Sequence, residues 1–439
     1  MDLPASFRDQ IDFLGILDGN SPFAVLSDQE IRQALTHPIW PNDCSTTSLN
    51  LVQPSETVCI IISDHTRTTA TDRILPIILD ALLNNGCSSQ DISLLIASGI
   101  HKHPTHDEII SIIGEESASI LGDHIFLHDP DDHNQLANVG SINGGVPVHV
   151  NRRAVEADRL ILIGAATYHY HAGFSGGRKS LVPGIASRAT IAYNHSLTLH
   201  PTENQLHPGA APGILDGNPV AESMLQAARL CKPDIIVNSV LNPEGLLIGV
   251  FSGELDLAHR EACRTVEKIY RVDISRPADI VIASAGKAPN WIQSHKALFN
   301  AMRATQKDGY VILIAPAPRG LGDDRFRHWI KKSSTDNIFR CLRKSPEVLG
   351  QTALSTKEKA SRTILITNMP ESDTTDLGIT LAADIECALQ TVCTTLTKQA
   401  GQRPSCYIMP HARYTVPFHA DVQYQSGTAP KGSGPCADR

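Results

Sequence analysis

The sequence has no run of the roughly 18–20 apolar residues that a membrane helix needs. Its start also lacks the basic and apolar regions of a secretory signal. None of its 10 cysteines forms a Cys-x-x-Cys pair. Scattered cysteines in apolar runs, such as Cys59, Cys231, Cys387 and Cys393, favour buried reduced thiols over disulfides or a zinc site. These absences predict a cytoplasmic protein with no membrane partner.

A basic surface stripe with interleaved aromatic residues is also absent, and the net charge is −8. This balance argues against a nucleic-acid partner. No internal repeat is visible, and 439 residues suffice for about two to three domains. Histidine is the residue in excess: the chain has 19, many of them between His101 and His207. The clustering of histidines beside glycine turns favours a catalytic or metal-binding role for some of them.

Apolar runs typical of buried strands alternate with segments of helical spacing along most of the chain. The expected strands are 57–63, 92–98, 159–163, 235–240, 246–251, 279–283, 310–314, 363–367 and 406–409. The expected helices are 71–86, 105–113, 255–269, 291–305, 347–360 and 380–398. This alternation predicts an α/β fold with two α/β domains, mainly parallel sheets and an interdomain cleft.

The pattern restarts after Ser275-Arg276-Pro277, which places a domain boundary near residue 275. Residues 1–274 are therefore predicted to form an N-terminal catalytic and cofactor-binding domain, and residues 275–417 a C-terminal α/β domain. Residues 418–439 contain Gly, Pro and Ser without periodicity, which predicts a disordered tail.

Polar side chains follow the first two predicted strands. Asp64 and Arg67 come directly after strand 57–63, and His101 follows strand 92–98. Ligands of open α/β sheets bind beyond the carboxyl ends of the strands, so all three side chains face the expected site. Arg67 could hold a carboxylate and His101 could act as a general base. Asp64 and Arg67 could equally well cap the next helix, and His101 could equally well be a surface histidine.

The segment 168–195 is the richest in chemically capable side chains. His169 and His171 precede the turn Ser175-Gly176-Gly177, Lys179 follows it, and His195 comes sixteen positions later. The turn resembles a phosphate-binding loop, but Arg178 separates glycine from lysine where a Walker loop has them adjacent. Its amides, with Arg178 and Lys179, could still bind a phosphate. A structural histidine is the alternative for His195.

Gln293 and Lys296 open the first helix after strand 279–283 and share one helix face. An amide and an ammonium that face a cleft suit a carboxylate or a phosphate. An exposed helix face is the alternative.

Together these segments resemble the nickel-dependent lactate racemase family over about residues 20–415. The shared signals are Asp-His-Thr-Arg after one strand, Ser-Gly-x-His after the next, and His-x-x-x-Gly-x-x-Gly-Gly-x-Lys. The later Asn-His and the Gln-x-x-Lys of the second domain complete the set, in the same order. Each signal is weak alone, and the five in order make a strong match.

The resemblance implies a nickel-pincer nucleotide, pyridinium-3-thioamide-5-thiocarboxylic acid mononucleotide, as the cofactor. It implies roles for eleven residues, which fall into five groups. These are Lys179 as the covalent tether, His195 as the nickel ligand, His101 and His169 as the catalytic bases, Arg67, Gln293 and Lys296 as substrate ligands, and Asp64, Ser175, Gly176 and Gly177 as parts of the cofactor pocket.

The implied reaction is inversion at C2 of a 2-hydroxy acid by proton-coupled hydride transfer to the nickel-pincer nucleotide. One histidine removes the hydroxyl proton, a planar 2-keto acid forms, and hydride returns to the opposite face. Two bases are needed because the enantiomers present their hydroxyls on different sides. The cofactor supplies sulfur ligands, so the chain needs no cysteine pair for nickel. The implied partners are a small-molecule 2-hydroxy acid and the cofactor-synthesis enzymes.

Two departures from the family bear on the substrate. Lactate-active members have an aromatic residue directly before the glutamine of Gln-x-x-Lys, where this chain has Ile292, with Trp291 one step earlier. His171 is an additional imidazole. Both changes are expected where the substrate side chain lies. They argue against lactate itself and leave open a larger or more polar 2-hydroxy acid, such as a sugar acid.

Two other functions remain as alternatives. A zinc or iron hydrolase could use the histidine cluster, which would require several protein ligands to one metal. A cofactor-binding protein without turnover would need the pocket but neither of the proposed bases.

Overall fold

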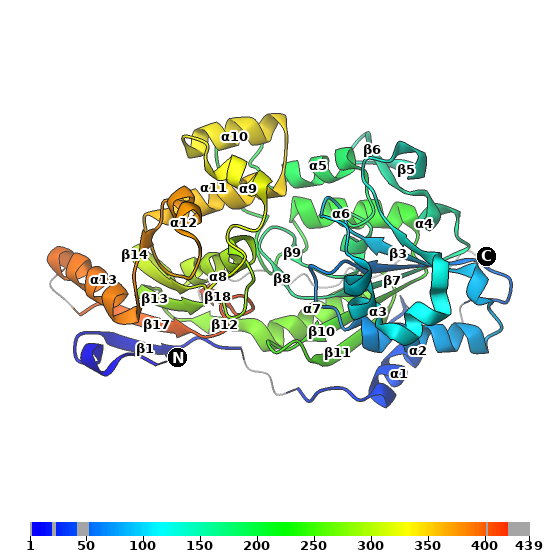
Figure 1. The fold of residues 1–439 in the computed structure, drawn as a ribbon, viewed down its shortest axis with the longest axis horizontal. Coiled ribbons are helices and arrows are strands. Elements are labelled where there is room, and N and C mark those ends of the chain that lie inside the picture. The colour runs from blue at the N-terminus through cyan, green and yellow to red at the C-terminus, as the bar shows by residue number, and fades with distance from the viewer. Residues whose placement is uncertain (1, 20–22, 42–51, 401–402, 420–439) are drawn as a thin grey trace.

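The computed structural model describes residues 2–19, 23–41, 52–400 and 403–419. It contains two six-stranded sheets, each covered by helices on both faces (Figure 1). All strand pairs in these two sheets are parallel except one hairpin. The predicted α/β class with mainly parallel sheets is confirmed.

The first sheet has the strand order β11-β10-β7-β2-β3-β4. Its strands are β2 (Val58–Ser63), β3 (Ile92–Ala97), β4 (Ile125–Leu127), β7 (Arg159–Ala165), β10 (Ile235–Leu241) and β11 (Leu247–Gly253). Its helices are α1 (Asp28–Thr36), α2 (Thr71–Asn84), α3 (His106–Leu121), α4 (Arg152–Glu156), α5 (Arg188–Ser196), α6 (Pro219–Cys231) and α7 (Leu257–Tyr270). Helices α1, α2 and α3 share one apolar core with the sheet, and α4, α5 and α6 share the core of the opposite face.

The second sheet has the order β1-β17-β13-β14-β15-β16. Its strands are β1 (Asp12–Ile16), β13 (Ala278–Ser284), β14 (Thr305–Ile314), β15 (Thr363–Ile366), β16 (Thr380–Leu381) and β17 (Ser405–Met409). Its helices are α8 (Trp291–Arg303), α9 (Asp324–Ile330), α10 (Thr335–Lys344), α11 (Val348–Ala360), α12 (Glu371–Leu377) and α13 (Ile385–Ala400).

Three small two-stranded sheets complete the fold. They are formed by β5 (Leu136–Ile142) with β6 (Val146–Asn151), β8 (Tyr168–His169) with β9 (Gly173–Phe174), and β12 (Arg271–Ile274) with β18 (Val416–His419). The sequence predicted none of the three pairs, because their strands are short or lack a continuous apolar run. The β8–β9 hairpin carries part of the functional segment.

The central strands are apolar on both faces, which explains why their sequences predicted parallel strands. In β2, all residues from Val58 to Ile62 are buried, with alternate side chains in opposite cores. A parallel strand covered by helices on both sides needs such a continuous apolar run. The exception is β11, which pairs antiparallel with β10 through a short connection.

The chain ends depart from the predicted domain limits. Strand β1 pairs with β17, so residues 12–16 complete the second sheet although the prediction assigned them to the first domain. Phe418 and His419, which were predicted to begin the tail, belong to β18, and Phe418 is buried. The rest of the predicted tail, residues 420–439, lies outside the described residues.

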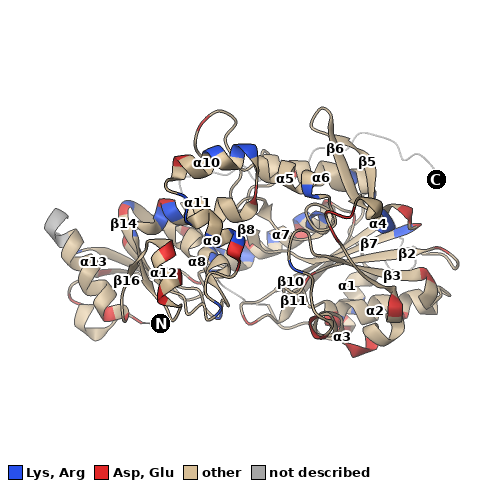
Figure 2. Ribbon diagram, turned by 45° about the horizontal axis from the view of Figure 1, so that its top comes forward, with Lys and Arg blue, Asp and Glu red and all other residues tan. Residues whose placement is uncertain are grey.

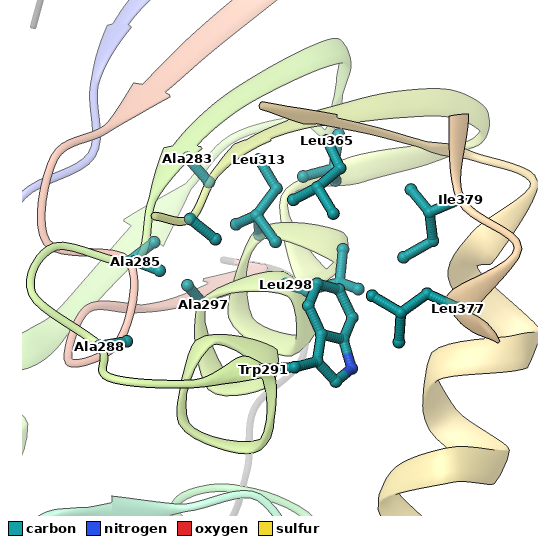
Figure 3. Packing of buried hydrophobic residues seen from close by; sticks show 14 of the residues in the cluster. Ala283, Ala285, Ala288, Trp291, Ala297, Leu298, Leu313, Leu365, Leu377 and Ile379 are labelled. Carbon is teal, nitrogen blue, oxygen red and sulfur yellow. The ribbon is translucent and has the colours of Figure 1, made fainter. Parts of the chain in front are cut away.

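Trp291, at the first position of α8, lies in the core of the second sheet (Figure 3). Its ring is fully buried near Leu377 and Ile379, and its indole N–H donates to Thr356 Oγ1 at 3.1 Å. Ile292 packs against the same core. Both residues therefore support the second sheet, and the prediction that the change at Ile292 touches the substrate is wrong.

The expected burial of the cysteines is met in part, since Cys59 and Cys393 are buried and Cys231 is half-buried. Lys and Arg are spread over several elements, among them α10, and acidic residues mark α2 and α3 (Figure 2). All eight described cysteines are free. Cys387 is exposed, against the prediction, because it lies near the start of α13 on the solvent side. No described helix has the length and apolar character to cross a membrane.

Candidate active site

The loops that carry the candidate residues meet where the first sheet reverses its strand order. From β2 the chain moves to β3 and β4 on one side, and then to β7 and β10 on the other. The loops after β2 and β7 therefore flank the switch point, where open α/β sheets bind their ligands. Asp64 and Arg67 follow β2, and His169 follows β7. The parallel topology alone brings these distant segments together.

A cavity of about 390 Å³ opens at this point and is lined from both α/β units. Ten of the eleven predicted site residues line it; they are Asp64, Arg67, His101, His169, Ser175, Gly176, Lys179, His195, Gln293 and Lys296. Gly177 is the exception. Its Cα faces the first sheet, where an added Cβ would meet Ile236 Cδ1 at 3.0 Å.

His101 is held by Asp64 at the mouth of the cavity. The Nδ1 of His101 donates to Asp64 Oδ2 at 2.7 Å, and Thr66 Oγ1 donates to Asp64 Oδ1 at 2.6 Å. Burial alone would raise the pKa of Asp64, but these hydrogen bonds and the charge of Arg67 lower it below its ordinary value. The ionised carboxylate therefore fixes the proton of neutral His101 on Nδ1. This leaves the Nε2 lone pair free to accept a proton.

His169 is held in the opposite tautomer. Its Nδ1 accepts hydrogen bonds from the backbone N–H groups of His171 at 3.2 Å and Ala172 at 3.1 Å. The neutral ring therefore carries its proton on Nε2. Burial, followed by the charge of Lys179, lowers the pKa of His169 well below its ordinary value. The two imidazoles thus present unlike groups, a lone pair from His101 and an N–H from His169.

The β8–β9 hairpin that holds His169 is fixed by both α/β units. The ring of Tyr168 stacks on that of Phe174 at 5.0 Å, within the hairpin. At its tip, the ring of Tyr170 lies 5.3 Å from Phe299 of α8, and its hydroxyl lies 3.3 Å from Thr352 Oγ1 of α11. The position of His169 thus depends on the second unit as well as the first.

The glycine turn lies tightly against the first sheet. Gly176 has φ of 102°, and a Cβ there would meet Asn238 Oδ1 at 2.7 Å. Ser175 Oγ donates to the carbonyl of Ala165 at 2.7 Å, so this hydroxyl fastens the turn to the end of β7. Arg178 does not line the cavity: it is 2% exposed, and its Nη1 lies 3.9 Å from Oδ1 of Asp256, the N-cap residue of α7. The suggestion that Arg178 binds a phosphate there is therefore wrong.

Lys179 lies in the short 3₁₀ helix Gly177–Ser180 and lines the cavity. Burial lowers the pKa of its amine well below the ordinary value, and the charges of Arg67, Lys296 and Arg178 lower it further. An amine whose pKa is lowered in this way loses its proton more readily than an ordinary lysine, and the deprotonated form is the one that attacks carbonyl carbon. The site can therefore supply a lysine nucleophile.

His195 occupies the last turn of α5 and lines the same cavity. Burial, followed by the charge of Lys179, lowers its pKa to about 4. A neutral imidazole keeps a lone pair for a metal at neutral pH. The described residues contain no group of three or more His, Cys, Asp or Glu side chains arranged to hold a metal ion. A hydrolase with several protein ligands to one metal would need such a group.

Basic side chains outnumber carboxylic acids in the cavity lining. The charged lining residues are Arg67, Lys179, Lys296, Arg413, Asp64 and Glu244. Lys296 comes from α8, whose first turn is capped by Asn290 Oδ1 accepting from the Gln293 backbone N–H at 3.0 Å. Burial and the charges of Arg67 and Arg413 lower the pKa of Lys296 well below its ordinary value. This field favours an anionic ligand.

Two lining residues escaped the sequence reasoning. Arg413 follows β17 by four residues, so the strand-end argument that found Asp64 and His101 applies equally to it. Gln351 lies within α11, where every residue from Leu349 to Thr356 is buried. No motif or periodic pattern distinguishes a glutamine in such a helix, so only the structure could identify it.

The fold and the cavity define a two-unit α/β protein whose ligand site brings together a buried lysine, several histidines and further basic side chains. Residues 10–206 match the lactate racemase N-terminal domain. The lactate racemase of Thermoanaerobacterium thermosaccharolyticum is 33% identical over 312 residues, which are 70% of each chain. The lactate racemase of Lactiplantibacillus plantarum is 34% identical over 307 residues, which are 69% of each chain.

Two solved structures have the same fold as this chain. The lactate racemase apoprotein of Thermoanaerobacterium thermosaccharolyticum aligns with a TM-score of 0.81 and 27% identity, over 95% of this chain and 97% of that one. A Thermotoga maritima protein shares the fold with a TM-score of 0.64 and 19% identity, over 90% and 98%. The chain belongs to the lactate racemase family, which confirms the resemblance seen in its sequence, and it is an isomerase of the racemase type.

Replacing Asp64 with asparagine tests whether this carboxylate positions His101. We expect Asp64→Asn to lower kcat by about 10²–10⁴-fold, because an amide can donate to Nδ1 and so favour the wrong tautomer. The circular dichroism spectrum should stay unchanged. Loss of cofactor from Asp64→Asn would instead support the role in cofactor binding that the sequence predicted. Asp72→Asn, on the first turn of α2, serves as the control.

Proposed function

We propose that this protein is a racemase or epimerase that inverts the C2 centre of a 2-hydroxy acid with a nickel-pincer nucleotide bound to Lys179. The observation that carries the proposal is the grouping of Lys179, His195 and two unlike imidazoles in one cation-lined cavity. A metal-dependent hydrolase has less support, since the described residues offer no multi-ligand metal group.

The residues fit the proposed cofactor. Lys179 can react as a free amine, which a covalent thioamide link requires, and His195 can give nickel one neutral nitrogen ligand. The cofactor would supply the remaining ligands. The turn at Ser175 and Gly176 bounds the pocket beside Lys179. When bound, the nucleotide supplies the hydride acceptor and donor that C–H cleavage at C2 requires.

The protein side chains would carry the proton chemistry and the orientation. Arg67, Gln293 and Lys296 would bind the substrate carboxylate and fix C2 between the two histidines. His101 would remove the hydroxyl proton at Nε2, with Asp64 stabilising the imidazolium that forms. His169 would serve the other face, where its Nε2 meets the oxygen of the opposite enantiomer.

Co-expression with the cofactor-synthesis enzymes tests the proposal. We expect about one nickel per chain, a mass addition at Lys179 in peptide mass spectrometry, and loss of optical activity from a single enantiomer of a 2-hydroxy acid. The protein made without that pathway should show none of these. A hydrolase would load metal in either host, so metal bound by the protein from the host without the pathway would contradict the proposal.

A further inference from the structure

Five side chains that line the cavity have buried hydrogen-bonding atoms that no described residue satisfies; they are those of Ser98, Tyr168, Arg413, His171 and Gln351. His171, at the tip of the β8–β9 hairpin, is 3% exposed, and neither Nδ1 nor Nε2 has a partner. Gln351 of α11 is fully buried, and its Oε1 has no partner. Both side chains line the cavity. Buried polar atoms in native proteins are normally satisfied, so these atoms point to a ligand.

Both residues are held firmly by other atoms. The backbone carbonyl of His171 accepts from Asn218 Nδ2 at 2.9 Å, and its backbone N–H donates to His169. The ring of His171 lies 4.2 Å from the ring of Tyr170. Gln351 Nε2 donates to the backbone carbonyl of His195 at 2.7 Å, which directs Oε1 elsewhere. The free atoms are therefore fixed in position before any ligand binds, which favours a specific contact.

The donor and acceptor character of the unpaired atoms of His171 and Gln351 indicates the kind of ligand that they bind. Burial lowers the pKa of His171 to about 3, so its ring is neutral and has one donor and one acceptor. Gln351 Oε1 only accepts. A carboxylate could not donate to these acceptors, an ammonium could not accept from His171, and an alkyl group could do neither. A hydroxyl group both donates and accepts, so it satisfies every one of these atoms.

We propose that His171 and Gln351 bind hydroxyl groups of the substrate beyond C2, so that the natural substrate is a polyhydroxylated 2-hydroxy acid of the sugar-acid class. The inference rests on the proposed function. Gln351 comes from the same α/β unit as Gln293 and Lys296, which would hold the substrate carboxylate. Ribose hydroxyls of the nucleotide carry the same chemistry, and the test separates the two sources.

The first test uses the unmodified, cofactor-loaded enzyme and needs no variant. The substrates are 2,3,4-trihydroxybutanoate and 2-hydroxybutanoate, which differ only in the hydroxyls at C3 and C4. We expect kcat/KM to be at least about 100-fold higher for the trihydroxy acid, because a site built for hydroxyls rejects an analogue that leaves its polar atoms unpaired. Equal or higher efficiency with 2-hydroxybutanoate would overturn the inference and leave the proposed function intact.

The second test removes the polar atoms from the protein. We expect His171→Phe and Gln351→Leu each to reduce the ratio of the two kcat/KM values by at least about 10-fold. Nickel content and the Lys179 mass addition should stay unchanged. A loss of nickel or of the mass addition would assign the hydroxyl contacts to the nucleotide and overturn the inference. The matched controls are His133→Phe and Gln29→Leu, whose side chains are exposed.

Binding measurements keep the two hypotheses distinct. If the loaded enzyme turns over neither acid, the proposed function fails. Calorimetric titration of the loaded protein with 2,3,4-trihydroxybutanoate then still tests whether His171 and Gln351 bind hydroxyl groups. Binding weakened about 10-fold or more in His171→Phe, with the circular dichroism spectrum unchanged, would support it. Equal binding by the variant and the unmodified protein would overturn it.

Discussion

Lys179→Ala is expected to abolish racemase activity, with a loss of at least about 10⁴-fold, because the cofactor that we propose to be bound to Lys179 would carry the bond-breaking step. The variant should show no mass addition after co-expression with the cofactor-synthesis enzymes. Its fold should persist, because the unmodified amine is itself costly to bury near Arg67 and Lys296. Circular dichroism and intact-mass spectrometry of the same preparation check both expectations.

Lys179→Arg separates the covalent link from the presence of a long basic side chain. Arginine fills the same place but stays protonated, so it cannot form the thioamide. We expect this variant to be as inactive as Lys179→Ala. Lys307→Ala, at an exposed position of β14, should keep full activity and the full mass addition. Activity in Lys179→Arg, or a mass addition at another lysine, would exclude Lys179 as the tether.

His101→Ala and His169→Ala are each expected to lower kcat by about 10²–10⁴-fold, the usual contribution of a positioned general base. Single-turnover measurements should tell the two apart. Each variant should lose the first half-reaction with one enantiomer and keep it with the other, because each base would serve one face. The absorbance of the loaded enzyme and chiral analysis of quenched samples follow the two half-reactions.

The tautomers of His101 and His169 also predict which enantiomer reacts more slowly. His101 already presents a lone pair at Nε2, whereas two backbone N–H groups hold the proton of His169 on Nε2. We therefore expect the enantiomer that depends on His169 to react more slowly in the unmodified enzyme. Loss of both half-reactions to the same extent in both variants would contradict the assignment of one base to each face. His133→Ala is the exposed control.

The strand ends explain why so much of the site could be predicted from the sequence. Asp64, Arg67 and His101 each follow an apolar run long enough to identify as a strand, and parallel strands deliver their carboxyl ends to one edge. Lys179 and His195 lie on a 3₁₀ helix and an α-helix, and their spacing within a family motif drew attention to them. Their chemical roles remain predictions.

Other features required contacts that no local pattern shows. Asp64 looked like a cofactor ligand, and only the 2.7 Å contact with His101 indicates a positioning role. Ile292 looked like a substrate contact, but the rotation of α8 directs it toward the core with Trp291. Arg178 neighbours Lys179 in sequence, yet the tight 3₁₀ turn directs the two side chains to opposite sides. Local spacing predicts which residues share an element better than it predicts where each side chain points.

The pairing of β1 with β17 has a consequence for biosynthesis. The strand at residues 12–16 is translated long before its partner at residues 405–409. All strands of the first sheet lie between residues 58 and 253, so the ribosome can release them while β1 still lacks its neighbour. Domains generally fold as units during synthesis. Lys179 and His195 can thus reach their places in the nascent chain before residues of the second unit complete the cavity around them.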